Sequence, residues 1–504
     1  MSDGLTRRHA LELGLASLVL LAGCGTEEVD ESPSGGGSTL KSVWMDPSGD
    51  GSLSPGPGAP LIDRTDLAPR APQGAQFARL AHVTDAHVLD AQSPARVPFL
   101  DRLGPPFTST FRPQETLTAQ VLGGAVAAIN ALAPDAVIQG GDLIDNAQAN
   151  ELAQALGVLA GGRVLRASGA GPYVGVQSAA NPDPFYYRPD IDAPRHPGLL
   201  AAALAPFRSR GLRAPVFPVL GDHDTLVAGV LPPTPMTQAI AVGDRAVWEL
   251  PSHLTGDRLT GPSGGVPDGF GDPAQINSLI AELLTVPAVT VPADSTRREL
   301  SVTDVLTRLS AGNGARITHD RLDYHFDIGA HLRVIVLDLV RRDGGSGGVI
   351  HPGQPQWLAQ ELRAAGERWV IVVSHQPLDT TQAADVLLAL LDRHPWTLAA
   401  LSGHTHRHRI TPRRAANGGY WLISTASLVD FPQQARALQI CFTEGGGVAL
   451  QTWALDHVPD GGGLGDTARD LSYIDAQGGR PQGLAGSELD RNVTLYRAPP
   501  AAIL

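Results

Sequence analysis

The sequence predicts an α/β fold, because short apolar runs typical of β-strands alternate with stretches that have helical periodicity. Five of the apolar runs end in a cluster rich in Asp, His or Gly. Loops that follow strands are free of ladder hydrogen bonds, and α/β proteins build their sites there. The chain has 504 residues, 42% of them hydrophobic, which is enough to bury a sizeable core.

The five strand ends follow one another along the chain. They are residues 77–83 before Thr84-Asp-Ala-His87, 135–138 before Gln139-Gly-Gly-Asp142, 216–220 before Gly221-Asp-His-Asp224, 369–373 before Ser374-His375, and 398–401 before Ser402-Gly-His-Thr-His406. Since residues i and i+2 of an extended chain face the same side, Asp85 and His87 are expected to reach one point together, as are His404 and His406. The spacing of apolar residues predicts helices over 115–132 and 356–362.

Three later apolar runs, at 420–425, 437–441 and 448–453, are expected to be antiparallel strands of a second sheet. Two long stretches, 157–214 and 225–318, break the alternating rhythm, and loops of this length are usually functional lids or insertions. We therefore expect one folded region over 78–457 that carries these two insertions. A weakly ordered Gly-rich tail is expected over 458–504.

Residues 1–24 are expected to be an export signal. Arg7 and Arg8 precede an apolar stretch too short to span a bilayer, which is typical of the twin-arginine route. Leu21-Ala-Gly-Cys24 resembles a bacterial lipobox, which implies a lipid on Cys24; a plain secretory signal cut nearby is the alternative. Residues 25–77, rich in Ser, Gly and Pro, are expected to be a flexible tether. The protein would then be lipid-anchored at the cell envelope, periplasmic or at the cell surface.

The composition argues against a nucleic-acid partner and against a fold held together by disulfides. The formal net charge is -13 and no long Lys/Arg run occurs, so stable nucleic-acid binding is not expected. With only two cysteines, Cys24 and Cys441, no disulfide framework holds the fold together. Cys441 lies in an apolar run and is expected to be a buried, inert thiol.

The residue types at the five strand ends indicate a metal centre. Imidazole nitrogen and carboxylate oxygen are the ligands of Zn, Mn and Fe, and no thiolate occurs among them. One carboxylate that bridges two ions would complete a two-metal site, which clamps the attacking and departing oxygens of a phosphoryl displacement. His408 is expected to be a packed or exposed histidine. Four further histidines lack such partners and are not expected to be ligands: His82, His196, His331 and His351.

In their order and at their strand ends, these motifs resemble the signature of the calcineurin-like metallophosphoesterases over about residues 78–455. They are most similar to the twin-arginine-exported branch, in which long inserts separate the motifs. The resemblance implies a four-layer αββα sandwich of two mixed sheets flanked by helices, with long insertions. It also implies two divalent or trivalent metal ions, Fe, Mn or Zn. One ion would bind Asp85, His87, Asp142 and His406, and the other Asp142, Asp222, His375 and His404.

The resemblance also implies a chemistry. His223 would stabilise the pentacoordinate state or protonate the leaving oxygen, and a hydrogen bond that it donates to Asp145 would fix its tautomer and orientation. The expected activity is hydrolysis of a phosphomonoester or phosphodiester by metal-bound hydroxide, on a small-molecule, lipid or nucleotide phosphate ester. The alternative is a non-catalytic surface lipoprotein that uses the same fold as a binding module. The oligomeric state is left open.

The third motif departs from the family pattern, because Asp222 stands where the family usually has Asn. Aspartate is still an oxygen ligand of the same reach, so coordination should survive. Its extra negative charge lowers the Lewis acidity of the site and raises the pKa of a bound water. We therefore expect slower activity or an altered metal preference.

Overall fold

The computed structural model describes residues 36–104, 110–169, 171–251, 280–311, 320–458, 463–478 and 483–500. The expected export signal, with Arg7, Arg8 and Cys24, lies outside these residues. Within them, no helix combines the length and the apolar character needed to cross a membrane.

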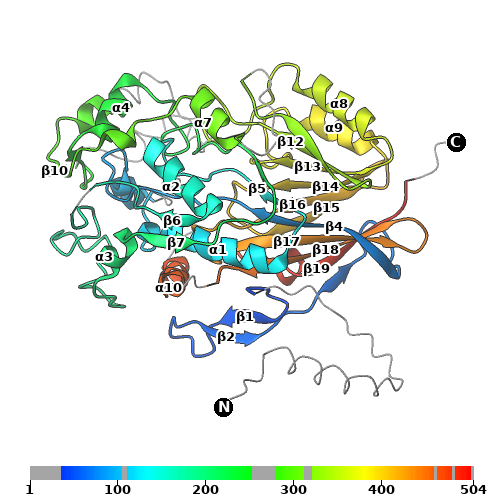
Figure 1. Cartoon of the computed structure of the whole chain (residues 1–504), viewed down its shortest axis with the longest axis horizontal. Helices are drawn as coiled ribbons and strands as arrows, with labels where there is room; N and C mark the ends of the chain where they lie inside the picture. Colours follow the sequence, from blue (N-terminus) through cyan, green and yellow to red (C-terminus); the bar gives the residue numbers. More distant parts are fainter. Residues whose placement is uncertain are drawn as a thin grey trace, which may run out of the picture. The chain divides into compact units, whose positions relative to one another are not determined.

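Two large mixed β-sheets form the centre of the fold (Figure 1). The seven-stranded sheet has the order β3 (Ile62–Arg64), β19 (Val493–Arg497), β18 (Val448–Asp456), β17 (Gln434–Thr443), β4 (Gln73–Val83), β5 (Ala136–Gln139) and β8 (Val216–Pro218). The six-stranded sheet has the order β11 (Tyr324–Ile328), β12 (Leu332–Leu337), β13 (Trp369–Ser374), β14 (Thr397–Ser402), β16 (Tyr420–Ser424) and β15 (Arg409–Arg413). The predicted α/β fold with two mixed sheets is confirmed.

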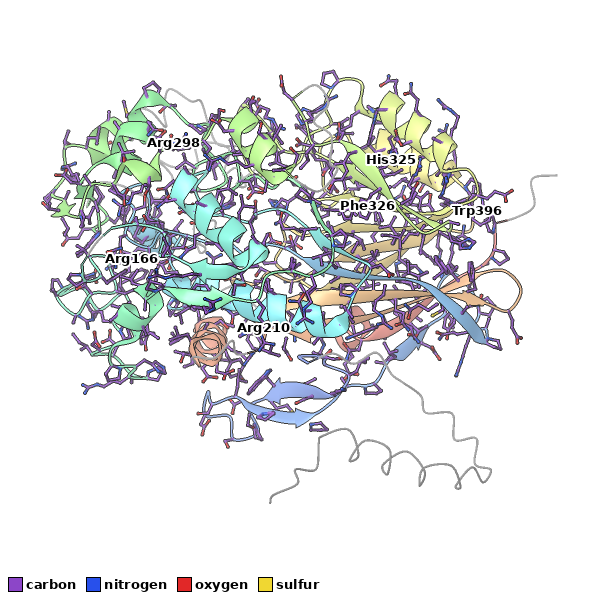
Figure 2. All side chains as sticks on the ribbon, in the orientation of Figure 1. Arg166, Arg210, Arg298, His325, Phe326 and Trp396 are labelled. Atoms are coloured by element: carbon purple, nitrogen blue, oxygen red, sulfur yellow. The ribbon has the colours of Figure 1, made fainter. Side chains whose placement is uncertain are left out.

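The alternation of side chains along β12 shows how the layers pack. Val334 and Val336 belong to the core that the two sheets share, whereas Ile335 and Leu337 pack with the helices on the outer face. Those helices are α8 (Gln354–Ala365) and α9 (Asp385–Arg393). At one edge, Phe217 of the seven-stranded sheet stacks on Phe326 of the six-stranded sheet, with ring centroids 3.6 Å apart. Phe326 is labelled in Figure 2.

The outer face of the seven-stranded sheet is covered by α1 (Thr118–Leu132), which contacts β4, β17 and β18. A 3₁₀ turn, η2 (Glu115–Leu117), precedes α1, so the predicted helix over 115–132 is confirmed. The helix ends where Ala133 adopts a left-handed conformation before Pro134. Helix α2 (Ala149–Ala160) packs beside α1. The layers are thus helix, sheet, sheet and helix.

The partners of the later strands differ from the expectation. β16 pairs in parallel with β14 and so belongs to the six-stranded sheet, whereas β17 pairs antiparallel with β4 in the other sheet. The prediction that all three later strands are antiparallel and form one second sheet was therefore wrong. These strands are buried on both faces, so their apolar pattern marks a strand but does not indicate its neighbour.

The expected tether and tail also differ from the structure where it describes them. The segment from residue 36 includes β1 (Ser42–Met45), β2 (Ser54–Pro57) and β3, while the C-terminal segment includes α10 (Leu464–Gln477), η4 (Glu488–Asp490) and β19. β19 is buried along its length and pairs with both β18 and β3. This long-range pairing orders segments whose Gly-rich and Pro-rich composition suggested otherwise, because composition does not record tertiary partners.

The two predicted insertions contain short elements of their own. The first holds β6 (Gly162–Val164), α3 (Leu199–Leu204) and β7 (Phe207–Ser209), and η1 (Pro98–Leu103) lies earlier in the chain. The second holds α4 (Pro235–Val242), β9 (Arg245–Ala246), β10 (Val289–Thr290), η3 (Ser295–Arg297) and α7 (Val302–Leu309). Fully buried Arg297 joins them: its Nε donates to Asp90 at 2.7 Å and its Nη2 to Ser168 at 2.9 Å.

Candidate metal centre

Five of the predicted site residues have an unusual backbone. Asp85, His87, Asp142, His404 and His406 all have positive φ angles, between 43° and 64°. Such left-handed conformations cost about 1–3 kcal/mol each for residues other than glycine, and they cluster at functional sites. Since β4 ends at Val83 and β14 at Ser402, the paired ligands meet through tight loops. The expected strand alternation is not the reason that they converge.

One cluster of side chains joins Asp85, His87 and His406, whose ligand atoms all lie within 4.8 Å of one another. The Nε2 atoms of His87 and His406 are 3.2 Å apart, and His406 Nε2 lies 3.4 Å from Asp85 Oδ1. Asp142 borders this cluster, because its Oδ2 lies 3.7 Å from His87 Nε2.

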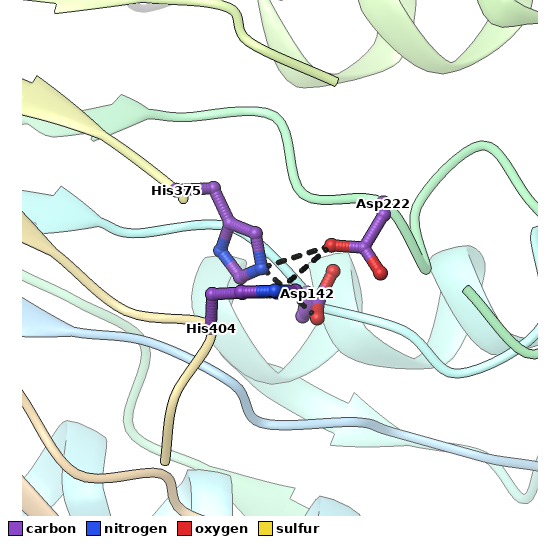
Figure 3. A group of neighbouring side chains, drawn as sticks. All are labelled: Asp142, Asp222, His375 and His404. Atoms are coloured by element: carbon purple, nitrogen blue, oxygen red, sulfur yellow. Dashed lines mark ion pairs between the residues drawn. The ribbon is translucent and has the colours of Figure 1, made fainter. Parts of the chain in front are cut away.

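A second cluster joins Asp142, Asp222, His375 and His404, also within 4.8 Å (Figure 3). His375 Nε2 lies 3.1 Å from Asp142 Oδ2 and 3.3 Å from Asp222 Oδ1. His404 Nδ1 lies 3.2 Å from the same Asp222 oxygen. The structure thus brings all seven predicted residues together in two groups. They match the groups that the resemblance implies, except that Asp142 belongs to the second group and only borders the first.

The donor atoms fit metal ions. His375 Nε2 is buried and makes no hydrogen bond to any described residue, while its Nδ1 contacts the Gly140 carbonyl at 2.8 Å. His87 and His406 both use Nδ1 on a carboxylate, so when both rings are neutral their Nε2 lone pairs face each other at 3.2 Å. Facing lone pairs repel, and a cation between them removes the repulsion.

The charges of the site also favour cations. Asp85, Asp142 and Asp222 are each at most 2% exposed. Burial raises the pKa of the Asp222 carboxyl, but His404 and His375 outweigh it and hold the pKa well below its ordinary value. The pKa of Asp85 is likewise lowered by His406, His375 and His87 against the effect of burial. Ionised carboxylates at this depth need positive partners.

His223 lies beside these clusters and reaches solvent, with its side chain 22% exposed. Its Nδ1 donates to the backbone carbonyl of Asp145 at 2.8 Å and lies 3.5 Å from the Asp145 carboxylate. That carboxylate instead accepts from His87 Nδ1 at 2.9 Å. The predicted pairing of His223 with Asp145 therefore runs mainly through the backbone carbonyl.

The ring of His223 has room only because residue 229 is glycine. A Cβ atom on Gly229 would lie 2.3 Å from His223 Cδ2 and Nε2, and this glycine has a φ of 71°. Burial lowers the pKa of His223, but the carboxylates of Asp142 and Asp145 raise it more, to about 10.

Several residues that contact the clusters have no motif of their own. Asp430 accepts from His406 Nδ1 at 2.5 Å, and Arg112 and Arg96 bind the carboxylates behind His406 and His87. Nothing local in the sequence singles out these three residues. Gln376, which donates to Asp222 Oδ1 at 3.0 Å, follows a predicted ligand directly. Adjacency to His375 was the only signal for it.

The remaining histidine and cysteine predictions concern packing. His408 is fully buried, with its Nδ1 accepting from Arg436 at 2.8 Å and its Nε2 donating to Gln434 at 3.1 Å. It is a packed histidine, as expected. Cys441 is a buried free thiol, which confirms the prediction. His82 contacts Thr425 Oγ1 at 2.8 Å and lies in neither ligand cluster.

No family model and no curated protein matches the sequence. Similar solved structures include a dimetal phosphatase from Danio rerio, with 14% identity and a TM-score of 0.41 over 76% of this chain and 98% of that one. PhoD has 10% identity and a TM-score of 0.31, over 84% of this chain and 79% of its own. SoxB, a sulfate thiohydrolase from Thermus thermophilus, has 12% identity and a TM-score of 0.30, over 80% of this chain and 61% of its own.

These are distant similarities of fold, and they assign no activity to this chain. The motif order, the two mixed sheets and the two ligand clusters are this chain's own features, and in these features it resembles the calcineurin-like metallophosphoesterases.

Proposed function

We propose that the protein is a metal-dependent hydrolase of phosphate esters, acting on a phosphomonoester or a phosphodiester. The observation that carries the proposal is the pair of adjacent, largely buried clusters of Asp and His side chains, in which Asp142 belongs to one cluster and borders the other. Among the described residues, His375 Nε2 has no hydrogen-bond partner. One ion would be held by Asp85, His87, Asp142 and His406, and the other by Asp142, Asp222, His375 and His404. Bound Fe, Mn or Zn would supply Lewis acidity and a nucleophile at neutral pH.

The chain's own contribution to the reaction is the positioned imidazole of His223. Its Nδ1 donates to the Asp145 carbonyl, so Nε2 is the ring nitrogen that can face a substrate. When the P–O bond breaks, a protonated His223 can donate the Nε2 proton to the leaving oxygen. The substrate would be a small-molecule, lipid or nucleotide phosphate ester, since the acidic chain disfavours a nucleic-acid partner.

Activity assays on the purified full chain test this proposal. We expect turnover of p-nitrophenyl phosphate or its bis-ester with Mn, Zn or Fe, and His223→Ala should lower kcat by about 10²–10⁴-fold with little effect on KM. His325→Ala is a matched control, because His325 is partly exposed and pairs with Glu361 away from the clusters. Bound metal without any turnover would instead support the non-catalytic binding module.

We also propose that the protein is exported by the twin-arginine route and anchored at the cell envelope by a lipid on Cys24. The support is the order of Arg7, Arg8, the apolar stretch and Leu21-Ala-Gly-Cys24. Fractionation of expressing cells should find the wild-type protein with membranes and the Cys24→Ala variant released from them. Equal release of both proteins would contradict the anchor and favour a plain secretory signal.

A further inference from the structure

The two candidate ion sites differ in the groups that contact the outer ring nitrogens of their histidines, the nitrogens that face away from the ion. We propose that Asp145 and Asp430 are positioning residues that make the site of Asp85, His87 and His406 bind its ion more tightly than the other site does. This inference rests on the proposed metal-dependent function and adds an order of loading to it.

Both histidines of the first site are backed by an ion pair. His87 Nδ1 donates to Asp145 Oδ1 at 2.9 Å, and Arg96 Nη1 donates to the other Asp145 oxygen at 2.5 Å. In the same way, His406 Nδ1 donates to Asp430 Oδ2 at 2.5 Å, and Arg112 Nε donates to Asp430 Oδ1 at 2.6 Å. Each ligand is therefore held by a carboxylate that is itself held by an arginine.

The two arginines share one buried support. Arg96 and Arg112 are 8% and 3% exposed, and Glu115, in η2 at the start of α1, is 1% exposed. Glu115 Oε2 accepts from Arg96 Nη2 at 2.6 Å and from the Arg112 backbone N–H at 3.2 Å. Because both chains of contacts end on this carboxylate, the orientations of His87 and His406 are fixed together.

The second site has no equivalent support. His375 Nδ1 contacts a neutral backbone carbonyl, that of Gly140, at 2.8 Å. His404 directs its Nδ1 at Asp222, and its side chain is 22% exposed. In the described part of the chain, no ion pair joins a carboxylate to the outer ring nitrogen of either histidine.

A carboxylate behind a histidine makes the imidazole a more basic ligand and fixes its tautomer and orientation. Loss of such a partner typically weakens metal affinity by about 10–100-fold. The first site has two of these carboxylates, so its ion should bind first and leave last. The ion at His375 and His404 should be the exchangeable one.

Metal titration of the chelator-stripped full chain tests the inference without any assay of activity. Calorimetry with Mn²⁺ or Zn²⁺ should give two binding events whose affinities differ at least about tenfold. Elemental analysis of the metal-loaded protein should confirm two bound ions. His404→Ala should abolish the weaker event. Asp430→Asn should weaken the tighter event by about 10–100-fold and leave the weaker event almost unchanged.

Asp392→Asn is the matched control, because Asp392 also forms an ion pair with a single arginine, Arg413 at 2.7 Å. Within the described residues its other side-chain partner is Tyr420, and it forms no ion pair with a histidine. The substitution should leave both events unchanged. If circular dichroism shows that Asp430→Asn is unfolded, Arg112→Gln tests the inference instead, because it leaves Asp430 in place without its charged partner. It should weaken the tighter event in the same direction.

Different failures have different meanings. Two events of equal affinity in the wild type, or equal weakening of both events by Asp430→Asn, would overturn the inference and leave the proposed function standing. An unchanged tight event in Asp430→Asn would overturn it as well. A wild-type protein that binds no metal would overturn the proposed function and the inference together.

Discussion

One carboxylate oxygen of Asp222, Oδ1, lies close to two histidines and one amide. Its Oδ1 lies 3.3 Å from His375 Nε2 and 3.2 Å from His404 Nδ1, and it accepts from the Gln376 amide at 3.0 Å. The amide donor offsets part of the charge that aspartate adds over the asparagine usual in the family that the motifs resemble. The ligand position is therefore kept, and the extra charge remains inside the site.

The effect of that charge on kcat/KM and on metal affinity can be measured with Asp222→Asn. The substitution keeps an oxygen at the same reach but removes one negative charge, so the bound cations should become stronger Lewis acids. At saturating metal we expect kcat/KM to rise by about 3–10-fold, while metal affinity falls by a similar factor. Steady-state kinetics over a metal series would show both changes. A 100-fold loss of activity at saturating metal would mean that the carboxylate itself is required.

At the level of elements, the positions of strands were predictable and their partners were not. The run at 369–373 lies within β13, and 356–362 lies within α8, because apolar periodicity reflects local burial. α8 also has a visible start and stop, since Gly353 and Gly366 have positive φ at its ends. Pairing depends on distant segments, which is why the sheet of β17 was assigned wrongly.

The candidate site likewise has residues that the sequence could predict and residues that it could not. The seven candidate ligands could be singled out because each lies in a motif directly after a strand, although tight loops rather than strand alternation bring them together. Asp430 lies beyond β16, 24 residues after the histidine that it contacts. Arg96 and Arg112 lie in loops between the first two motifs. An isolated acid or arginine has no pattern, and only the fold reveals its role.

In the whole molecule, the insertions are attached to the two-sheet core through buried polar groups. Arg297 of the second insertion reaches Asp90 in the loop after the first motif, and Ser168 in the first insertion. Glu299, two residues later, lies beside Gln148 of the loop after the second motif. Buried ionisable groups of this kind make the stability of the whole chain depend on pH.

Glu299 gives that dependence a definite sign. Its Oε2 accepts from Thr237 at 2.8 Å, its Oε1 is buried without a partner among the described residues, and burial raises its pKa from 4.5 to about 7. Between these two values the folded protein keeps a proton that the unfolded chain releases, so the free energy of unfolding falls as pH rises, by up to about 3 kcal/mol.

Glu299→Gln should remove this loss, because glutamine keeps the shape and the hydrogen bond without a charge. Urea unfolding of the wild type should show a lower free energy at pH 8 than at pH 5, and the variant should lose about 3 kcal/mol less over the same interval. Glu444→Gln, at an exposed position, should follow the wild type. An equal loss in Glu299→Gln and the wild type would place the pH dependence in other buried groups, with Glu299 already ionised in the folded protein at pH 5.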